Sequence, residues 1–135
     1  MLTFKFREDK VGNEIFARPF VSLKLSSPYG EAEVFALIDS GADRTIIPSY
    51  FAEELHLEIG HRIETRGLGG VAEGYESTIT IKFSDIQGER EVIEDVPVYV
   101  LDDFEDVIIG RKKIFEMFRV IFEQLNNRIL LERME

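Results

Sequence analysis

Apolar and polar residues alternate at every second position in several stretches of the chain, and this pattern restricts the fold more than any other feature. Side chains of a β-strand point alternately to its two faces, so each stretch predicts a strand with one buried face. The clearest stretches are 2–7, 78–83, 96–101 and 118–123. Turn-forming residues separate the predicted strands at 9–13, 26–30, 85–88 and 124–127. The pattern predicts an all-β domain.

Three segments depart from the alternation. Val34–Ile38 is apolar at every position and predicts a central strand that is buried on both faces. Pro48–Leu55 and Arg111–Phe118 carry apolar residues at helical spacing, and each predicts roughly two turns of helix. The expected fold is therefore all-β with one or two short helices.

Composition restricts the class of protein further. The chain has 135 residues, 44% of them hydrophobic, which is enough for one compact domain. Its 16 basic and 26 acidic residues leave a net charge of −10, which disfavours nucleic acid and anionic lipid as partners. Cysteine is absent, so disulfides and thiol chemistry are excluded. Without a signal-peptide pattern or an apolar stretch long enough to span a membrane, the expectation is a soluble, cytoplasmic protein.

The segment Ala36–Asp43, with the sequence ALIDSGAD, carries the most chemical information. An apolar strand ends there in Asp39, and Ser40 and Gly41 follow. A carboxylate at the end of a buried strand is costly unless it is hydrogen-bonded or shares a proton. By itself the pattern also fits a strand-to-turn junction in which Asp39 and Ser40 bond local backbone groups.

Two later segments favour the functional interpretation. Gly67–Gly70 has the sequence GLGG, and one apolar residue among three glycines is typical of a mobile hairpin tip. Val107–Arg111 has the sequence VIIGR, an apolar strand that ends at a glycine and precedes a predicted helix. Each could be an ordinary turn or junction if it occurred alone.

The order of these segments resembles that of the retropepsins, the single-domain aspartic proteases of retroviruses and their cellular relatives. An apolar strand, Asp-Ser-Gly-Ala, a glycine-rich hairpin, Ile-Ile-Gly-Arg, a short helix and a final strand pair follow one another. The resemblance covers residues 14–132, with Arg18–Leu25 in the place of the family's first core strand. Residues 1–13 have no counterpart and are expected to add an N-terminal strand. The resemblance implies a single domain over 1–135, folded as a closed acid-protease β-barrel and acting as a homodimer.

The resemblance also implies roles for individual residues. Asp39 is the expected catalytic carboxylate, Ser40 bonds to the loop of the partner subunit, and Gly41 lets the two loops meet closely. Substrate-binding residues are expected at Ala42, Asp43, Gly67, Leu68, Gly69 and Gly70, the last four as a flap over the peptide. Gly110 and Arg111 are expected to support the catalytic loop, with Arg111 paired to Asp43.

The proposed chemistry needs two carboxylates, and the chain supplies one Asp-Ser-Gly. Two facing carboxylates share one proton, so one can activate water while the other protonates the scissile carbonyl. The second carboxylate must then come from a second copy across a two-fold axis. The sequence therefore predicts a homodimeric aspartic endopeptidase that acts on extended peptides without a cofactor. The alternative is a retropepsin-like dimerisation or peptide-binding module with little or no cleavage. His56 and His61 lack a third ligand, so no metal site is expected.

Overall fold

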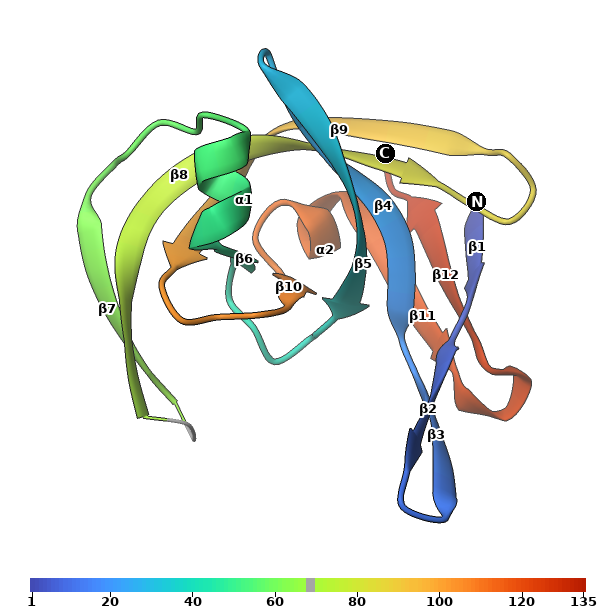
Figure 1. Ribbon diagram of the computed structural model, residues 1–135. Helices are drawn as coiled ribbons and strands as arrows, with labels where there is room; N and C mark the ends of the chain where they lie inside the picture. The colour runs from blue at the N-terminus through green and yellow to red at the C-terminus, as the bar shows by residue number, and fades with distance from the viewer. Residues whose placement is uncertain (68–69) are drawn as a thin grey trace.

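The computed structural model describes residues 1–67 and 70–135, and most of these residues lie in strands. It confirms the predicted all-β fold with short helices (Figure 1). In chain order the elements are β1 (Leu2–Lys5), β2 (Arg7–Val11), β3 (Glu14–Arg18), β4 (Phe20–Ser27), β5 (Gly30–Ile38), β6 (Thr45–Pro48), α1 (Ser49–Glu54), β7 (Arg62–Gly67), β8 (Gly70–Ser84), β9 (Arg90–Leu101), β10 (Val107–Ile109), α2 (Ile114–Met117), β11 (Phe118–Glu123), η1 (Gln124–Asn126) and β12 (Arg128–Arg133). Within the described ranges, no helix is long and apolar enough to cross a membrane.

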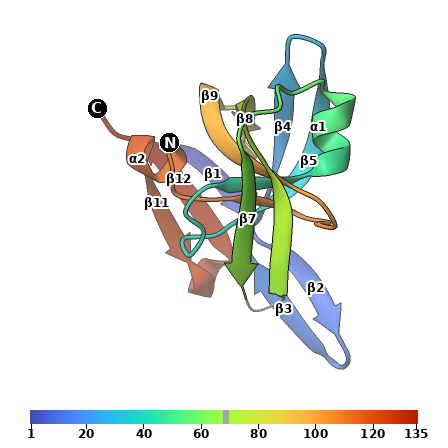
Figure 2. The same cartoon turned by 90° about the vertical axis from the view of Figure 1, so that its left-hand side faces the viewer.

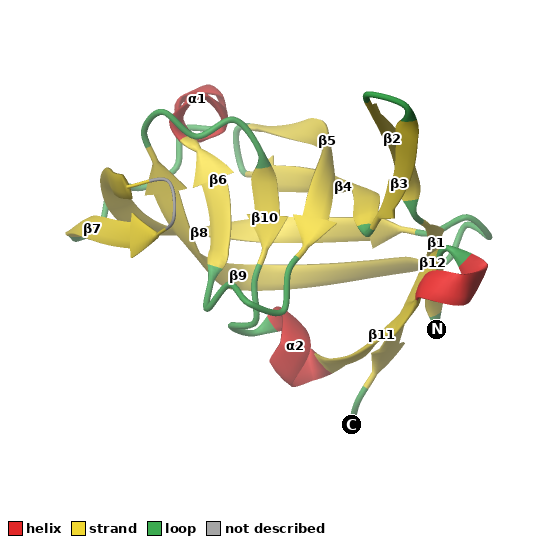
Figure 3. Ribbon diagram, turned by 90° about the horizontal axis from the view of Figure 1, so that it is seen from below, coloured by secondary structure: helices red, strands yellow, loops and turns green. Residues whose placement is uncertain are grey.

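The main sheet bends until six of its seven strands form a closed circuit, with β7 added outside it along β8. Its order is β4-β5-β10-β6-β9-β8-β7, and β4 also pairs with β8. Most neighbours are antiparallel, but β10 pairs with β5 in parallel and β6 pairs with β9 in parallel. Seen from below, β6, β10 and β5 lie side by side across the middle of one face (Figure 3). This arrangement brings the ends of β5 and β10 together at the same edge.

The core fills the inside of this circuit with the apolar residues of each alternating strand. Leu25, Ile81 and Ile109 are fully buried. One end is covered by α1, whose Ala52 and the following Leu55 are buried while Glu53 and Glu54 face outward. The helix predicted over Pro48–Leu55 is therefore confirmed.

The interpretation of Val34–Ile38 as a strand buried on both faces is wrong. Burial along β5 alternates, with Val34, Ala36 and Ile38 buried and Phe35 59% exposed. Only the inner face of β5 meets the core, because the outer face carries no covering layer from the described part of the chain. Phe35 instead lies beside the guanidinium of Arg7, 5.9 Å from its ring centre.

The second predicted helix is shorter than expected. Residues 111–118 were predicted to form about two turns, but α2 spans only Ile114–Met117. Lys113 has a φ of +70°, which lies outside the helical region, so the helix cannot begin before Ile114. Phe118 already belongs to β11 and is buried in the core.

A second, three-stranded sheet of order β1-β12-β11 joins the two ends of the chain. Phe83 of the main sheet lies between Phe4 and Phe118, with ring centres 6.2 Å from each, and ties the two sheets together. The N-terminal segment thus contains two strands, β1 and β2, where one was expected.

The outer edge of β1 is occupied by the turn between β8 and β9. The Asp85 carboxylate accepts the backbone N–H of Thr3 at 2.9 Å, and Ile86 donates its own N–H to the Thr3 carbonyl. Burial raises the pKa of the Asp85 carboxyl, but backbone N–H groups of Thr3, Glu89 and Gln87 outweigh it and leave this pKa below its usual value. The anchored carboxylate therefore holds the terminal sheet against the main sheet.

Candidate active site

Asp39 lies directly after β5, where the parallel partner β10 fixes its backbone. The Asp39 N–H donates to the Ile109 carbonyl at 2.9 Å, which continues the β5–β10 pairing by one residue. The carboxylate is therefore at the end of a strand whose two neighbours, β4 and β10, are both in the core sheet. This placement agrees with the strand-end position expected from the sequence.

The residues after Asp39 form a tight turn that orients its carboxylate. The Gly41 N–H donates to Asp39 Oδ1 at 2.8 Å, and the Ala42 N–H donates to the Asp39 carbonyl at 3.3 Å. These are the local bonds of an ordinary turn as well, so they serve both interpretations of the motif. Asp39 is half-buried, whereas Ser40 and Gly41 are exposed at the surface of the single chain.

The segment after β10 supports this turn from behind. Arg111 and Lys112 donate backbone N–H groups to the carbonyls of Ala42 and Asp43, at 2.9 and 2.8 Å. Gly110 donates to the hydroxyl of Thr45, which is completely buried. A Cβ at Gly110 would lie 2.4 Å from the carbonyl carbon and oxygen of Arg44, so only glycine fits. The two chain segments are thus held together by backbone bonds at close range.

The predicted pair between Asp43 and Arg111 is present. Arg111 Nη2 donates to Asp43 Oδ1 at 2.5 Å, a single contact rather than a bidentate one. In the single chain the Asp43 side chain is 82% exposed and the Arg111 side chain is 55% exposed. An exposed pair of this kind stabilises a fold by little, because water screens both charges.

The substitution Arg111→Ala should therefore lower the free energy of unfolding of the isolated chain by less than about 1 kcal/mol. Urea denaturation, at chain concentrations low enough to keep the protein monomeric, measures this value. Lys112→Ala is the matched control, since Lys112 makes a similarly exposed pair with Glu116 at 3.7 Å. A loss of about 3 kcal/mol for Arg111→Ala, typical of a buried pair, would contradict the expectation.

The hairpin of β7 and β8 lies on the same side of the molecule as the Asp39 turn (Figures 1 and 2). The two strands pair as far as Gly67 and Gly70, and Gly70 has a φ of +108° that favours glycine. Leu68 and Gly69, the expected tip of the flap, lie outside the described residues. The hairpin itself is therefore present where the flap was predicted.

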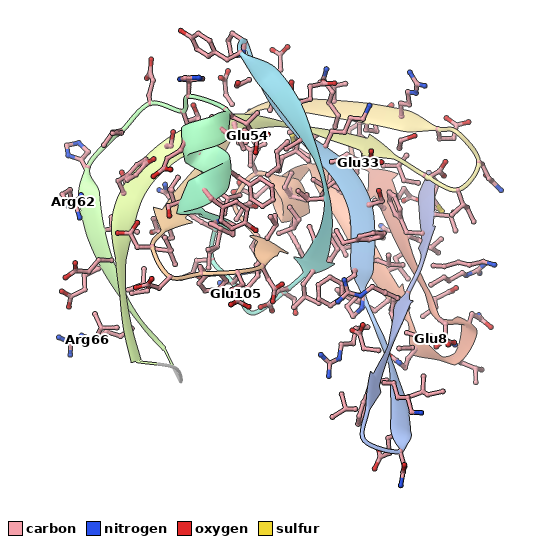
Figure 4. The ribbon with its side chains drawn as sticks, viewed as in Figure 1. Glu8, Glu33, Glu54, Arg62, Arg66 and Glu105 are labelled. Carbon is pink, nitrogen blue, oxygen red and sulfur yellow. The ribbon has the colours of Figure 1, made fainter. Side chains whose placement is uncertain are left out.

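A groove of about 880 Å³ separates this hairpin from the Asp39 turn and from the loop after β9. Arg44 lies over the ring of Tyr99, 5.1 Å from its centre, and both residues line the groove. Tyr50 of α1 donates its hydroxyl to the Glu105 carbonyl and ties the loop after β9 to the helix. Glu105 is labelled in Figure 4. The lining residues are Ala42, Asp43, Arg44, Ile46, Thr65, Arg66, Gly70, Val71, Ala72, Glu73, Tyr99, Leu101, Asp102, Asp103 and Phe104.

The groove contains three of the residues expected to bind substrate, Ala42, Asp43 and Gly70. Asp39 and Ser40 are not among its lining residues. Thr45 and Arg44 were not predicted from the sequence. A hydroxyl in the apolar run before Pro48 was the available signal for Thr45, whereas nothing in the sequence places Arg44 against Tyr99.

These features define an aspartic-protease fold, and comparisons with known proteins give its family. The model of the family described as gag-polyprotein putative aspartyl protease matches residues 29–114, which include the Asp39 turn, the β7–β8 hairpin and Gly110. The chain belongs to this family.

Solved structures of retropepsin-like proteases share the fold. A retropepsin-like aspartic protease from Rickettsia conorii is 11% identical, with a TM-score of 0.64 over 96% of this chain and 88% of that one. The retroviral protease-like domain of Ddi1 from Leishmania major is 16% identical, with a TM-score of 0.53 over 89% and 96%. EIAV protease, complexed with the inhibitor HBY-793, is 22% identical, with a TM-score of 0.50 over 76% and 88%. No curated protein sequence matches the chain.

Proposed function

We propose that this chain is an aspartic endopeptidase whose active site forms between two copies, with one Asp39 carboxylate from each. The observation that carries the proposal is the Asp39 turn. It holds one carboxylate at a strand end, with Gly41 N–H bonded to its Oδ1, and presents Ser40 and Gly41 outward. A second copy related by a two-fold axis would bring an identical turn against it.

The mechanism follows from the proximity of two like charges. Two carboxylates a few ångströms apart resist double ionisation, so the pair holds one proton between them. The ionised member takes a proton from water, and the protonated member donates one to the carbonyl oxygen of the scissile bond. Water attacks the carbonyl carbon, and the resulting intermediate breaks when the amide nitrogen leaves with a proton. Neither a cofactor nor a covalent intermediate is required.

The groove between the β7–β8 hairpin and the Asp39 turn is the proposed substrate site. It is lined by residues of the edge strand β7 and by Ala42 and Asp43, so we expect an extended peptide to pair with backbone groups there as an added strand. The β7–β8 hairpin, with Gly67 and Gly70 at its described end, would cover the peptide and exclude water from the bond that breaks.

Mass spectrometry of a diverse peptide library, incubated with the chain at several pH values and chain concentrations, tests the proposal. We expect cleavage that declines at alkaline pH, where the carboxylate pair loses its shared proton. Activity per chain should fall on dilution below the dimer dissociation constant, in proportion to the dimer fraction.

A strictly monomeric sample with full activity would contradict the proposed dimeric site. A stable dimer that binds peptides from the library without cleaving them at any pH would favour the alternative, a dimerisation or peptide-binding module. The intact Asp-Ser-Gly supports the enzyme, since a binding module has no need of the carboxylate.

A further inference from the structure

The hairpin of β2 and β3, residues 7–18, stands apart from both sheets and is called the arm below. Among the described residues, its two strands pair only with each other. Figures 1 and 2 both show it extending past the body of the molecule. An isolated two-stranded hairpin is only marginally stable in water, so an arm of this kind gains from a surface to pack against.

The base of the arm is fixed to the body. The Arg7 guanidinium lies over the Phe20 ring, 3.7 Å from its centre, and Gln124 Nε2 donates to the Ala17 carbonyl at 3.3 Å. Asp9 accepts from Arg7 at 3.0 Å and lies 3.9 Å from Arg18. These contacts set the direction of the arm, while the part beyond them makes no contact with the body that the structure records.

The free part of the arm carries exposed apolar side chains on both faces. Val11, Ile15 and Phe16 are 55%, 66% and 41% exposed. In the register of the hairpin, Phe16 lies opposite Asp9 and Ile15 lies opposite Lys10, so Ile15 and Phe16 point to opposite faces. Folding the arm back onto its own body would cover only one of these faces.

The end of β11 and the η1 turn lie at the base of the arm and carry two more exposed apolar side chains. Phe122 is exposed, and Leu125 is 95% exposed. Gln124 lies between these two residues in the sequence, and its Nε2 donates a hydrogen bond to the base of the arm. The arm, Phe122 and Leu125 therefore form one region.

A second copy of the chain is the occupant that fits this region. The arm extends on the side of the molecule that carries the turn between β5 and β6, at the bottom of Figure 1. A stable interface buries about 800 Å² from each partner, far more than the few small residues around Asp39 can supply. The arm is electrically neutral within a chain of net charge −10, so it can approach a second copy without repulsion. Its charged residues are Arg7, Lys10 and Arg18 with Glu8, Asp9 and Glu14, of which Glu8 is labelled in Figure 4.

We infer that the arm, together with Phe122 and Leu125, docks on a second copy of this chain and supplies much of the dimer interface. The inference rests on the proposed function, because that function fixes the side of the molecule on which the second copy lies. It assigns dimer stability to the arm and chemistry to the Asp39 turn, so the two can be separated by substitution.

The test is the dimer dissociation constant of a triple variant, Val11→Thr, Ile15→Thr and Phe16→Thr, measured by sedimentation equilibrium. Threonine keeps the preference for strand structure while removing apolar surface. We expect the dissociation constant to rise about tenfold or more. Cleavage per chain should fall near the parental dissociation constant and recover at higher chain concentration, because the active site is untouched. The control is Ile86→Thr with Val92→Thr, two exposed apolar residues outside the arm, which should leave the dissociation constant unchanged.

A single substitution tests the same surface without removing apolar side chains. Lys10→Glu gives the arm a net negative charge, so we expect weaker dimerisation that added salt partly restores. Lys10→Gln should have a smaller effect.

The outcomes separate the arm from the proposed function. One outcome is a parent protein that dimerises and cleaves while the triple variant and Lys10→Glu both keep its dissociation constant. That result overturns the role of the arm and leaves the proposed function standing. A dimer that never cleaves but is weakened by the arm variants supports the arm and contradicts the enzyme. A parent that stays monomeric at every concentration overturns both.

Discussion

The substitution Asp39→Asn is expected to abolish peptide cleavage, with a loss of about a thousandfold or more, because it removes the groups that exchange protons with water and substrate. The asparagine side-chain oxygen can still accept the Gly41 N–H that now lies 2.8 Å from Asp39 Oδ1. The turn should keep its shape, and the free energy of unfolding should change little. Dimerisation should be equal or stronger, because in the proposed dimer two carboxylates would no longer face each other. Initial cleavage rates, thermal unfolding and sedimentation equilibrium on one preparation measure all three.

Asp106→Asn is the matched control for this experiment. Asp106 is an exposed acid just before β10, and its substitution removes one negative charge without touching the Asp39 turn. Its cleavage rate should stay within about twofold of the parent, since surface charges act weakly. An Asp39→Asn protein that cuts peptides at the parental rate would exclude Asp39 as the catalytic acid.

Gly110→Ala should have the second largest effect, on both stability and cleavage. The added Cβ would lie 2.4 Å from backbone atoms of Arg44 and 2.9 Å from the Ala42 carbonyl oxygen, so the backbone of the turn must move. We expect a loss of about 1–3 kcal/mol in the free energy of unfolding, as for other overpacked sites. Cleavage should fall about a hundredfold, because a displacement of about 1 Å at an active site has that consequence. Urea denaturation and initial rates measure the two effects.

Gly30→Ala provides the steric control. A Cβ at Gly30 would meet only Leu55 Cδ2, at 4.0 Å, which is ordinary contact. This variant should unfold at the same or slightly higher urea concentration, since alanine restricts the unfolded chain. If Gly110→Ala does not fold, Thr45→Val is the second variant. It leaves the Gly110 N–H without its acceptor and should cost about 1–3 kcal/mol. Parental stability and rate in both variants would show that the support behind the turn is unimportant.

Local patterns in the sequence were sufficient to predict most strands, α1 and the position of the Asp39 turn. Period-two alternation reports which face of a strand meets the core, and this holds wherever only one face is covered. The same reasoning failed at Phe35, because an apolar residue on an uncovered outer face looks identical in sequence to one in a buried strand. The helix predicted around α2 was also too long, because the residue type of Lys113 does not indicate its positive φ.

The site could be predicted less completely than the fold. The Asp43–Arg111 pair was predicted through the family resemblance and is present, but its exposure depends on what surrounds it in space. Thr45 could not be assigned from spacing, because its hydroxyl accepts from Gly110 across a long stretch of sequence. The arm was not predicted, because its residues were expected to form a turn and part of one strand. The contacts that direct it, Arg7 with Phe20 and Gln124 with Ala17, are also remote in sequence. Roles that depend on such distant neighbours can be assigned only from the folded structure.

The parallel pairing of β5 with β10 has a consequence for when the Asp39 turn can become ordered during synthesis. Asp43 and Arg111 are separated by 68 residues, and every backbone bond that supports the Asp39 turn from β10 spans a similar distance. Contacts so remote in sequence form slowly, and they cannot form at all before both segments have left the ribosome. A nascent chain that ends before β10 therefore has the aspartate but no ordered turn to present it. We expect a chain of the proposed enzyme to be inactive until β10 has been synthesised and has paired with β5.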